Sequence, residues 1–297
     1  MSMQPTILVT GVNGQVGFEL VRTLQGLGRV IALDRAALDL ADLAQVRSTV
    51  RELKPSVIVN PAAYTAVDKA ETDVDAAMRL NGEAPGVLAE EAARSGAVLI
   101  HYSTDYVFDG TGSSPYVEDD ATNPQNVYGK SKLAGEQAIA ESGCAHLILR
   151  TSWVYGVRGK NFLLTMLKLG AERPELRVVA DQIGAPTWSN TIATSTCHII
   201  AQSLAANDAG WWLERSGIYH LTAAGETSWH GFAKAILDMA MGEKTPNVIP
   251  IGTSDYPVPA KRPANSRMSH RKLSDTFGLT LPDWQDALRL CMADRCV

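Results

Sequence analysis

Short runs of consecutive apolar and β-branched residues recur along the first half of the chain, and they limit its fold more than any other feature. These runs occupy residues 6–10, 30–33, 57–60, 97–102 and 147–151. Helical periodicity separates them, with Val16, Leu20 and Leu24 four residues apart and a long helix predicted over 73–94. Unbroken apolar strands are typical of a parallel sheet covered by helices on both faces. The sequence therefore predicts an α/β fold, a doubly wound, Rossmann-like parallel sheet.

Composition argues against several kinds of partner. The net charge of -5 and the pI near 5.7 lack the basic footprint of a nucleic-acid-binding domain. Residues 182–207 carry no charge, but Pro186 and many Ser, Thr and Asn residues make this span unfit for a membrane helix. No export signal is visible, and four cysteines without a CxxC pair do not suggest a disulfide scaffold. We expect a cytoplasmic chain with neither nucleic-acid nor membrane partners, and no metal site, because the histidines lack paired ligand spacing.

Residues 11–17 read Gly-Val-Asn-Gly-Gln-Val-Gly and join the first predicted strand to the first predicted helix. Glycines at this spacing permit a tight turn, so a pyrophosphate can reach the backbone N–H groups where the helix begins. Asp34 ends the second predicted strand, where a carboxylate can accept from an adenosine ribose hydroxyl and favours NADH. The guanidinium of neighbouring Arg35 could instead hold the 2′-phosphate of NADPH. The motif predicts a dinucleotide site and leaves the choice between NADPH and NADH open.

The second half of the chain is less regular. An amphipathic helix is predicted from Trp188 to Leu204 and a short strand over 218–221. Prolines crowd residues 246–263, which favours ordered loops over sheet interior. We expect residues 1–170 to form the dinucleotide-binding domain, to which 187–223 return. Residues 171–186 and 224–297 would form a smaller substrate-binding lobe at the carboxyl edge of the sheet.

Tyr128 and Lys132 are four residues apart, so on a helix both side chains project from one face. A fixed ammonium near a phenol is expected to lower the pKa of the phenol and make it a usable general acid for a carbonyl under reduction. The same lysine could hold ribose hydroxyls of the cofactor. Thr104 lies in the loop that follows the carboxyl end of a predicted parallel strand. Its hydroxyl could donate to the oxygen that Tyr128 protonates. Such a spacing occurs by chance in many helices, and the added threonine favours chemistry over a surface pair.

Several separate stretches, in the right order along most of the chain, resemble the extended short-chain dehydrogenase/reductase family. They lie at residues 11–17, 60–71, 102–110, 126–136, 150–155 and 262–267. The resemblance implies reduction by NADPH or NADH of the C4 keto group of dTDP-4-dehydro-6-deoxy-L-mannose, which gives dTDP-L-rhamnose. Within the family, a small-molecule deoxysugar nucleotide would be the partner of this chain.

The resemblance also implies roles for individual residues. Tyr128 would be the proton donor, Lys132 its partner and Thr104 the hydroxyl that tunes it. The cofactor would be lined by Gly11, Val12, Asn13, Gly14, Gln15, Val16, Asp34, Asp39, Leu40, Ala63, Tyr64 and Thr65, together with Tyr128 and Lys132. The deoxysugar nucleotide would meet Thr104, Asp105, Trp153, Arg262 and Arg267. Trp153 could equally be a core aromatic, and the two arginines could be solvated surface residues.

Some members of this family are similar in forming a dimer in which glutamates bind a bridging magnesium ion. Glu19 matches one such position, but Asn190 stands where another glutamate would be. Because an amide is a weaker ligand than a carboxylate for a hard cation, the bridge is not expected here. A homodimer stays open.

The same fold is compatible with two other functions. One is that of a nucleotide-sugar epimerase or dehydratase. Dehydratases are similar to one another in having a glutamate directly after the Thr-Asp pair. This chain has Tyr106 at that position, which argues against a dehydratase. The other is a non-enzymatic, dinucleotide-binding regulatory subunit of the methionine adenosyltransferase type. The complete set of Thr104, Tyr128 and Lys132 favours an enzyme.

Overall fold

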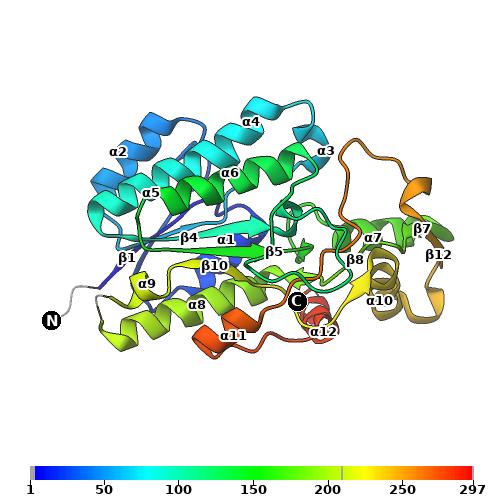
Figure 1. Cartoon of the computed structure of the whole chain (residues 1–297). Coiled ribbons are helices and arrows are strands. Elements are labelled where there is room, and N and C mark those ends of the chain that lie inside the picture. The colour runs from blue at the N-terminus through cyan, green and yellow to red at the C-terminus, as the bar shows by residue number, and fades with distance from the viewer. Residues whose placement is uncertain (1–3, 209, 296–297) are drawn as a thin grey trace.

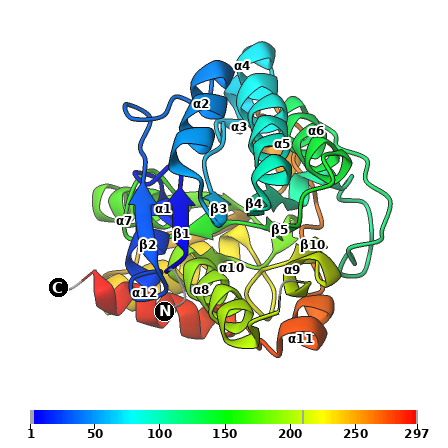
Figure 2. The same cartoon turned by 90° about the vertical axis from the view of Figure 1, so that its left-hand side faces the viewer.

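A six-stranded parallel sheet forms the centre of the computed structural model, which describes residues 4–208 and 210–295. The strands lie in the order β10-β5-β4-β3-β1-β2, which Figure 2 shows from one end of the strands. Their bounds are β1 (Thr6–Val9), β2 (Arg29–Ala32), β3 (Val57–Asn60), β4 (Val98–Thr104), β5 (His146–Thr151) and β10 (Gly217–His220). The predicted doubly wound α/β fold is confirmed. Because the strand order reverses between β1 and β3, their carboxyl ends open a crevice there.

Helices cover both faces of the sheet (Figures 1 and 2). One layer holds α2 (Leu43–Leu53), α4 (Val74–Met78), α5 (Ala84–Ser95) and α6 (Val127–Glu141), with the short α3 (Val67–Ala70) beside them. The other holds α1 (Gln15–Thr23), α8 (Ser189–Ala206), α9 (Trp211–Glu214) and α11 (Arg271–Phe277). The predicted helices after β1 and near 188–204 are confirmed as α1 and α8.

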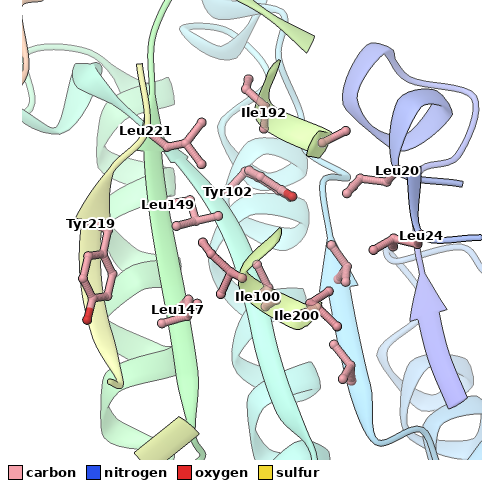
Figure 3. Close-up of a cluster of buried hydrophobic side chains, with 14 of the residues drawn as sticks. Leu20, Leu24, Ile100, Tyr102, Leu147, Leu149, Ile192, Ile200, Tyr219 and Leu221 are labelled. Carbon is pink, nitrogen blue, oxygen red and sulfur yellow. The ribbon is translucent and has the colours of Figure 1, made fainter. Parts of the chain in front are cut away.

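The two faces of each central strand enter two different hydrophobic clusters. Leu20 of α1, Leu24 just after this helix and Ile192 of α8 belong to one cluster with Ile100 and Leu149 of the sheet, and all five are labelled in Figure 3. Alternate residues of the same strands, such as Leu99, pack against the α2, α5 and α6 layer. Burial on both faces explains why the strands read as unbroken apolar runs.

The helix predicted over 73–94 is present, but it contains a π-helical turn at Arg79–Glu83 between α4 and α5. Asn81 lies in this turn and is completely buried. Its side chain donates to the Tyr64 carbonyl and to Ser131 Oγ of α6, and it accepts from the Tyr64 N–H. The π-turn therefore ties the loop after β3 to helix α6, as π-turns near functional sites often do.

A third hydrophobic cluster lies beyond the carboxyl ends of the strands, at the right of Figure 1. It is built from α7 (Phe162–Glu172), β7 (Glu175–Val179), α10 (Trp229–Met241), β12 (Asn247–Ile251) and α12 (Trp284–Asp294). Short strand pairs connect this region to the sheet: β6 (Val154–Tyr155) with β9 (Thr187–Trp188), and β8 (Ile183–Gly184) with β11 (Thr227–Ser228).

Two local expectations were wrong. The proline-rich span 246–263 is not all loop, because β12 runs through Pro250 and pairs with β7. This sheet has only two strands, so each has an edge where a missing N–H does not break a ladder. Asp34 does not end the second strand, since β2 stops at Ala32. In the part of the chain that the structure describes, no helix is both long and apolar enough to cross a membrane.

A buried ion pair fixes helix α6 on the sheet. Arg150 of β5 donates from Nε and Nη2 to the two carboxylate oxygens of Glu136, at 3.0 and 2.7 Å. Both side chains are only 2% exposed. A bidentate pair of this kind fixes the relative orientation of its two side chains in addition to attracting them, so it sets the register of α6 against β5.

Replacing Glu136 with Gln should destabilise the protein by about 3–5 kcal/mol, because the buried guanidinium of Arg150 keeps its charge and loses its compensation. Urea unfolding followed by circular dichroism measures this change in the free energy of unfolding. Asp238→Asn is the control, since Asp238 pairs with Lys234 on the exposed face of α10 and its loss should cost less than about 1 kcal/mol. Equal losses in the two variants would contradict this account.

Candidate active site

The glycine turn after β1 has the shape that a pyrophosphate needs. Gly11 has a φ of 57°, and a Cβ there would lie 2.8 Å from the Ala62 side chain. A Cβ on Gly17 would lie 2.3 Å from the Gly11 carbonyl oxygen, so only glycine allows this approach. Helix α1 begins after Gly14 without a side-chain cap. Its first N–H groups therefore stay available to an anion, and the turn fits a dinucleotide phosphate.

A cleft of about 520 Å³ runs from this turn across the carboxyl ends of the strands. Most of the predicted cofactor residues line it: Gly11, Gly14, Gln15, Val16, Asp39, Leu40, Ala63, Thr65, Tyr128 and Lys132. Further lining residues were not predicted from the sequence: Gly17, Leu38, Pro61, Ala62, Leu80, Tyr102, Ser103, Thr151, Val154, Gly159 and Lys160. Ser103 and Thr151 could have been found, since each lies where a predicted strand ends, whereas nothing in the sequence pointed to Gly159 or Lys160.

Four of the predicted cofactor residues, Val12, Asn13, Asp34 and Tyr64, are not among those that line the cleft. The carboxylate of Asp34 accepts from the N–H groups of Ala36 and Ala37, and Asn13 donates to it at 3.3 Å. Tyr64 donates its phenol proton to Asp73. Arg35 does line the cleft, and its side chain is 82% exposed. At this end of the cleft, the exposed charges are thus the guanidinium of Arg35 and the carboxylate of Asp39, which lie 3.6 Å apart as an ion pair.

Tyr128 and Lys132 project from α6 into the cleft as predicted. Asn126 caps the helix by accepting from the Gly129 N–H at 2.8 Å. A Cβ on Gly129 would lie 2.2 Å from the Tyr106 carbonyl oxygen, so the glycine lets the start of α6 touch the segment that follows β4. This contact brings Tyr128 to the end of β4.

Thr104 stands beside Tyr128 at that strand end, close enough for its hydroxyl to lower the pKa of the phenol. The Thr104 hydroxyl donates to Asp105 at 3.0 Å and accepts from the Tyr106 N–H at 3.2 Å. Burial raises the pKa of Asp105 to about 6, against several hydrogen bonds that lower it. The site thus brings together the partly buried phenol of Tyr128, the buried hydroxyl of Thr104 and the buried carboxyl of Asp105.

The sequence predicted that the ammonium of Lys132 would lower the pKa of Tyr128, and the structure does not show this. Burial raises the pKa of Tyr128 to about 12, and the hydrogen bond from Thr104 lowers it only in part. Lys132 Nζ instead lies 2.6 Å from the Tyr102 carbonyl oxygen and 2.9 Å from His101 Nε2. Burial lowers the pKa of Lys132 to about 8, and Glu136 raises it in part. Desolvation of both groups therefore outweighs their attraction.

Trp153 has a φ of 49°, which is unusual for a residue with a side chain. Its ring stacks on that of Trp229, with centroids 3.6 Å apart, and fills the space that a Cβ of Gly184 would need. Trp229 is held in turn by a hydrogen bond from its Nε1 to Gln182. Backbone strain that the surroundings maintain is frequent at ligand sites, which favours the substrate role over the core role.

The two arginines predicted for the diphosphate already have carboxylate partners. Arg262 donates to both oxygens of Asp68, at 3.0 and 2.9 Å. Arg267 donates to Glu226 and to the Ser113 carbonyl. Neither is a solvated surface residue, since their side chains are 27% and 22% exposed.

At the position of the family's metal bridge, Asn190 donates its amide proton to Glu19 at 3.1 Å within the same chain. Among the described residues, no group of three or more His, Cys, Asp or Glu side chains is arranged to hold a metal ion.

Comparisons with known proteins agree with this geometry. The family described as RmlD substrate binding domain matches residues 4–296. A protein of Burkholderia thailandensis named dTDP-4-dehydrorhamnose reductase is 54% identical over 294 residues, which cover 97% of this chain and 98% of the relative. The protein of that name from Escherichia coli K12 is 46% identical over 289 residues, with 94% of each chain covered.

Solved structures are similar along the whole chain. The dTDP-4-dehydrorhamnose reductase of Bacillus anthracis in complex with NADP has a TM-score of 0.90 at 36% identity, covering 98% of this chain and 100% of that one. A UDP-glucose 4-epimerase of Thermus thermophilus in complex with NAD has a TM-score of 0.78 at 20% identity, and shares the fold. The family match spans nearly every residue, and the curated relatives align over almost their full lengths. This chain therefore belongs to the RmlD substrate binding domain family.

Proposed function

We propose that this chain reduces the C4 keto group of dTDP-4-dehydro-6-deoxy-L-mannose with NADPH or NADH, giving dTDP-L-rhamnose. The observation that carries the proposal is the partly buried Tyr128, which lies beside Thr104 and lines the cleft that starts at the glycine turn. The names of relatives such as the B. thailandensis and E. coli reductases support the same substrate.

A reduced nicotinamide bound in the cleft supplies the hydride that C4 receives. The remaining work falls to the chain's own residues. A phenol with a pKa of about 12 keeps its proton at neutral pH, so Tyr128 is in the donor form when the ketone binds. Tyr128 gives this proton to the C4 oxygen as the carbon gains the hydride. The Thr104 hydroxyl, which donates to Asp105 in this structure, turns to donate a second hydrogen bond to the same oxygen and stabilises its negative charge in the transition state.

Substrate contacts beyond the keto group belong to the same proposal. Thr104, Asp105 and Trp153 would touch the deoxysugar nucleotide, with the Trp153 ring as a flat wall backed by Trp229. Arg262 and Arg267 would bind the diphosphate only by exchanging a carboxylate partner for it, since Asp68 and Glu226 hold them in this structure.

We further propose residues 171–186 and 224–297 as the substrate-binding lobe, and 1–170 with 187–223 as the dinucleotide-binding domain. The hydrophobic cluster that joins β7, α10 and α12 supports the smaller lobe. Two helices pack against the part to which their residue numbers do not assign them: α7 packs in the cluster of the smaller lobe, and α11 packs in a cluster of the central sheet. Residues 1–3 and 296–297 lie outside the described residues. A homodimer would form without the metal bridge, because Glu19 is already bonded to Asn190.

A cytoplasmic location is part of the proposal. Cys144, Cys197 and Cys291 are free thiols, which suits a reducing compartment, and Cys296 lies outside the described residues.

Oxidation of NADPH or NADH by the purified protein, with dTDP-4-dehydro-6-deoxy-L-mannose compared with other keto sugars, tests the function directly. The expected product is dTDP-L-rhamnose, identified by NMR. Tightly retained NAD without net cofactor turnover would instead indicate an epimerase or dehydratase. Co-purification of a methionine adenosyltransferase, with no activity on nucleotide sugars, would indicate a regulatory subunit.

Replacing Tyr128 with Phe should lower kcat by about 10²–10⁴-fold, because the proton donor is lost while the ring is kept. The dissociation constant of NADPH, measured by fluorescence titration, should change little. Tyr219→Phe is the matched control, since its phenol donates to the Arg215 carbonyl on the far side of the sheet. Wild-type turnover in Tyr128→Phe would refute the assigned role.

Replacing Arg35 with Ala should weaken NADPH binding by about tenfold or more, the worth of one charge-assisted contact, and leave NADH binding nearly unchanged. The reason is that Arg35 lines the cleft, whereas the carboxylate of Asp34 is occupied by the Ala36 and Ala37 N–H groups. Isothermal titration with each cofactor measures the two affinities. An Arg51→Ala variant, remote from the cleft, controls for net charge. Equal loss for both cofactors would count against a phosphate contact.

A further inference from the structure

A line of buried polar side chains crosses the sheet beneath the cleft and ends at Lys132. It starts at Thr10, the residue before the glycine turn, whose hydroxyl lies 2.6 Å from Asn60 Oδ1. The Asn60 amide lies 3.0 Å from His101 Nδ1, and His101 Nε2 lies 2.9 Å from Lys132 Nζ. Thr10 and Lys132 are 1% exposed, and Asn60 and His101 are 0% exposed.

Neighbouring strands bring these residues together. Asn60 of β3 and His101 of β4 are register partners, and Thr10 donates its backbone N–H to the Val59 carbonyl. Leu99 and Ile58, on the same sides of these strands, belong to the cluster under α5 and α6. His101 therefore replaces an apolar residue in a face that is otherwise hydrophobic. An imidazole there costs desolvation energy, which its two hydrogen bonds offset.

The imidazole in this line is neutral. Burial lowers the pKa of His101 well below its usual value, and the charge of Lys132 lowers it further. A neutral imidazole has one N–H and one acceptor nitrogen. When Lys132 is an ammonium, it must donate to Nε2, and the proton of His101 then lies on Nδ1, toward Asn60. This tautomer requires the Asn60 amide to turn its carbonyl oxygen to His101 and its NH2 group to the Thr10 hydroxyl, the reverse of the orientation in which Thr10 donates to Oδ1.

We propose that His101 is a positioning residue for Lys132: its Nε2 accepts a hydrogen bond from the lysine ammonium and holds that charge one helical turn from Tyr128 during the reduction. With the Tyr102 carbonyl, His101 occupies two of the three N–H donors of Lys132. The third donor stays free for the cleft, where it can meet the phenol oxygen of Tyr128 or a ribose hydroxyl. This inference rests on the proposed reductase function for its kinetic consequence, and on geometry alone for the bond itself.

Other charged and titratable groups surround Lys132. On α6, Tyr128 precedes it by one turn, and Glu136 follows by one turn and is neutralised by Arg150 of β5. After β4, Asp105 lies next to Thr104. The phenol of Tyr102 points to the other face of the sheet, where it bonds with Thr196. Since burial already lowers the pKa of Lys132 to about 8, loss of one acceptor for the ammonium should lower it further.

Two variants of His101 separate its two hydrogen bonds. His101→Gln places a carbonyl oxygen near the position of Nε2 and can still accept from Lys132. His101→Asn places its amide near the position of Nδ1, so it keeps the contact with Asn60 and loses the one with Lys132. Both leave a polar group in the same buried site, so a general loss of stability should affect them alike. Thermal unfolding of each variant measures that loss separately.

The direct measurement is NMR titration of protein labelled with ¹³C at the lysine Cε, with the Lys132 signal assigned by its absence in Lys132→Met. The titration midpoint of Lys132 is expected to be near that of the wild type in His101→Gln. In His101→Asn it should be lower by about one pH unit or more, the worth of a hydrogen bond to a charged group. An unchanged midpoint in His101→Asn overturns the proposal, whatever the melting temperatures.

Kinetics give the second readout. The alkaline limb of kcat for keto-sugar reduction should move with the Lys132 midpoint, to lower pH in His101→Asn and little in His101→Gln. NADPH affinity at pH 7 should stay within about threefold, since His101 does not line the cleft. If the wild-type protein reduces no keto sugar, the proposed function fails, and the NMR titration still decides the role of His101. A limb that stays in place while the Lys132 midpoint moves would overturn the link between this bond and the reaction.

Discussion

Helix α6 lies in backbone contact with the segments on either side of it, and the site depends on this approach. Two of its residues are glycines for that reason. A Cβ on Gly129 would meet the Tyr106 carbonyl oxygen, and one on Gly135 would meet the Asn81 carbonyl oxygen at 2.1 Å. A side chain at either position would push α6 away from the backbone of Tyr106 or of Asn81. Tyr128 would then leave Thr104, because hydrogen bonds tolerate only a few tenths of an ångström.

The same close approach explains the electrostatics. A helix pressed against a sheet excludes water, so every ionisable group between them is desolvated. Arg150 and Glu136 meet this cost with a bidentate pair. Lys132 has no carboxylate in contact, and its hydrogen bonds go to a carbonyl oxygen and an imidazole. Its charge is therefore easily lost, which fits the part in the reduction that we propose for this lysine.

The sequence predicted what local pattern determines. Apolar runs located the strands, the glycine spacing located the phosphate turn, and the four-residue interval placed Tyr128 and Lys132 on one face of a helix. It did not predict partners that the fold brings from distant segments. The pairing of Arg262 with Asp68, the bond between Asn60 and His101, and the π-turn around Asn81 all depend on tertiary contacts. The pKa of Tyr128 was predicted in the wrong direction because spacing reports a neighbouring charge and says nothing of burial.

The stacked pair of Trp153 and Trp229 also has a mechanical meaning. Trp153 lies two residues after the end of β5, and Trp229 is the first residue of α10, so the pair joins the central sheet to the smaller cluster of helices. If the two parts tilted relative to each other, the rings would slide and the flat surface they present would change its angle. The angle of the surface that we propose to contact the sugar thus depends on the stiffness of this joint. A substitution that changed the stiffness of the joint would therefore also change the angle of this surface.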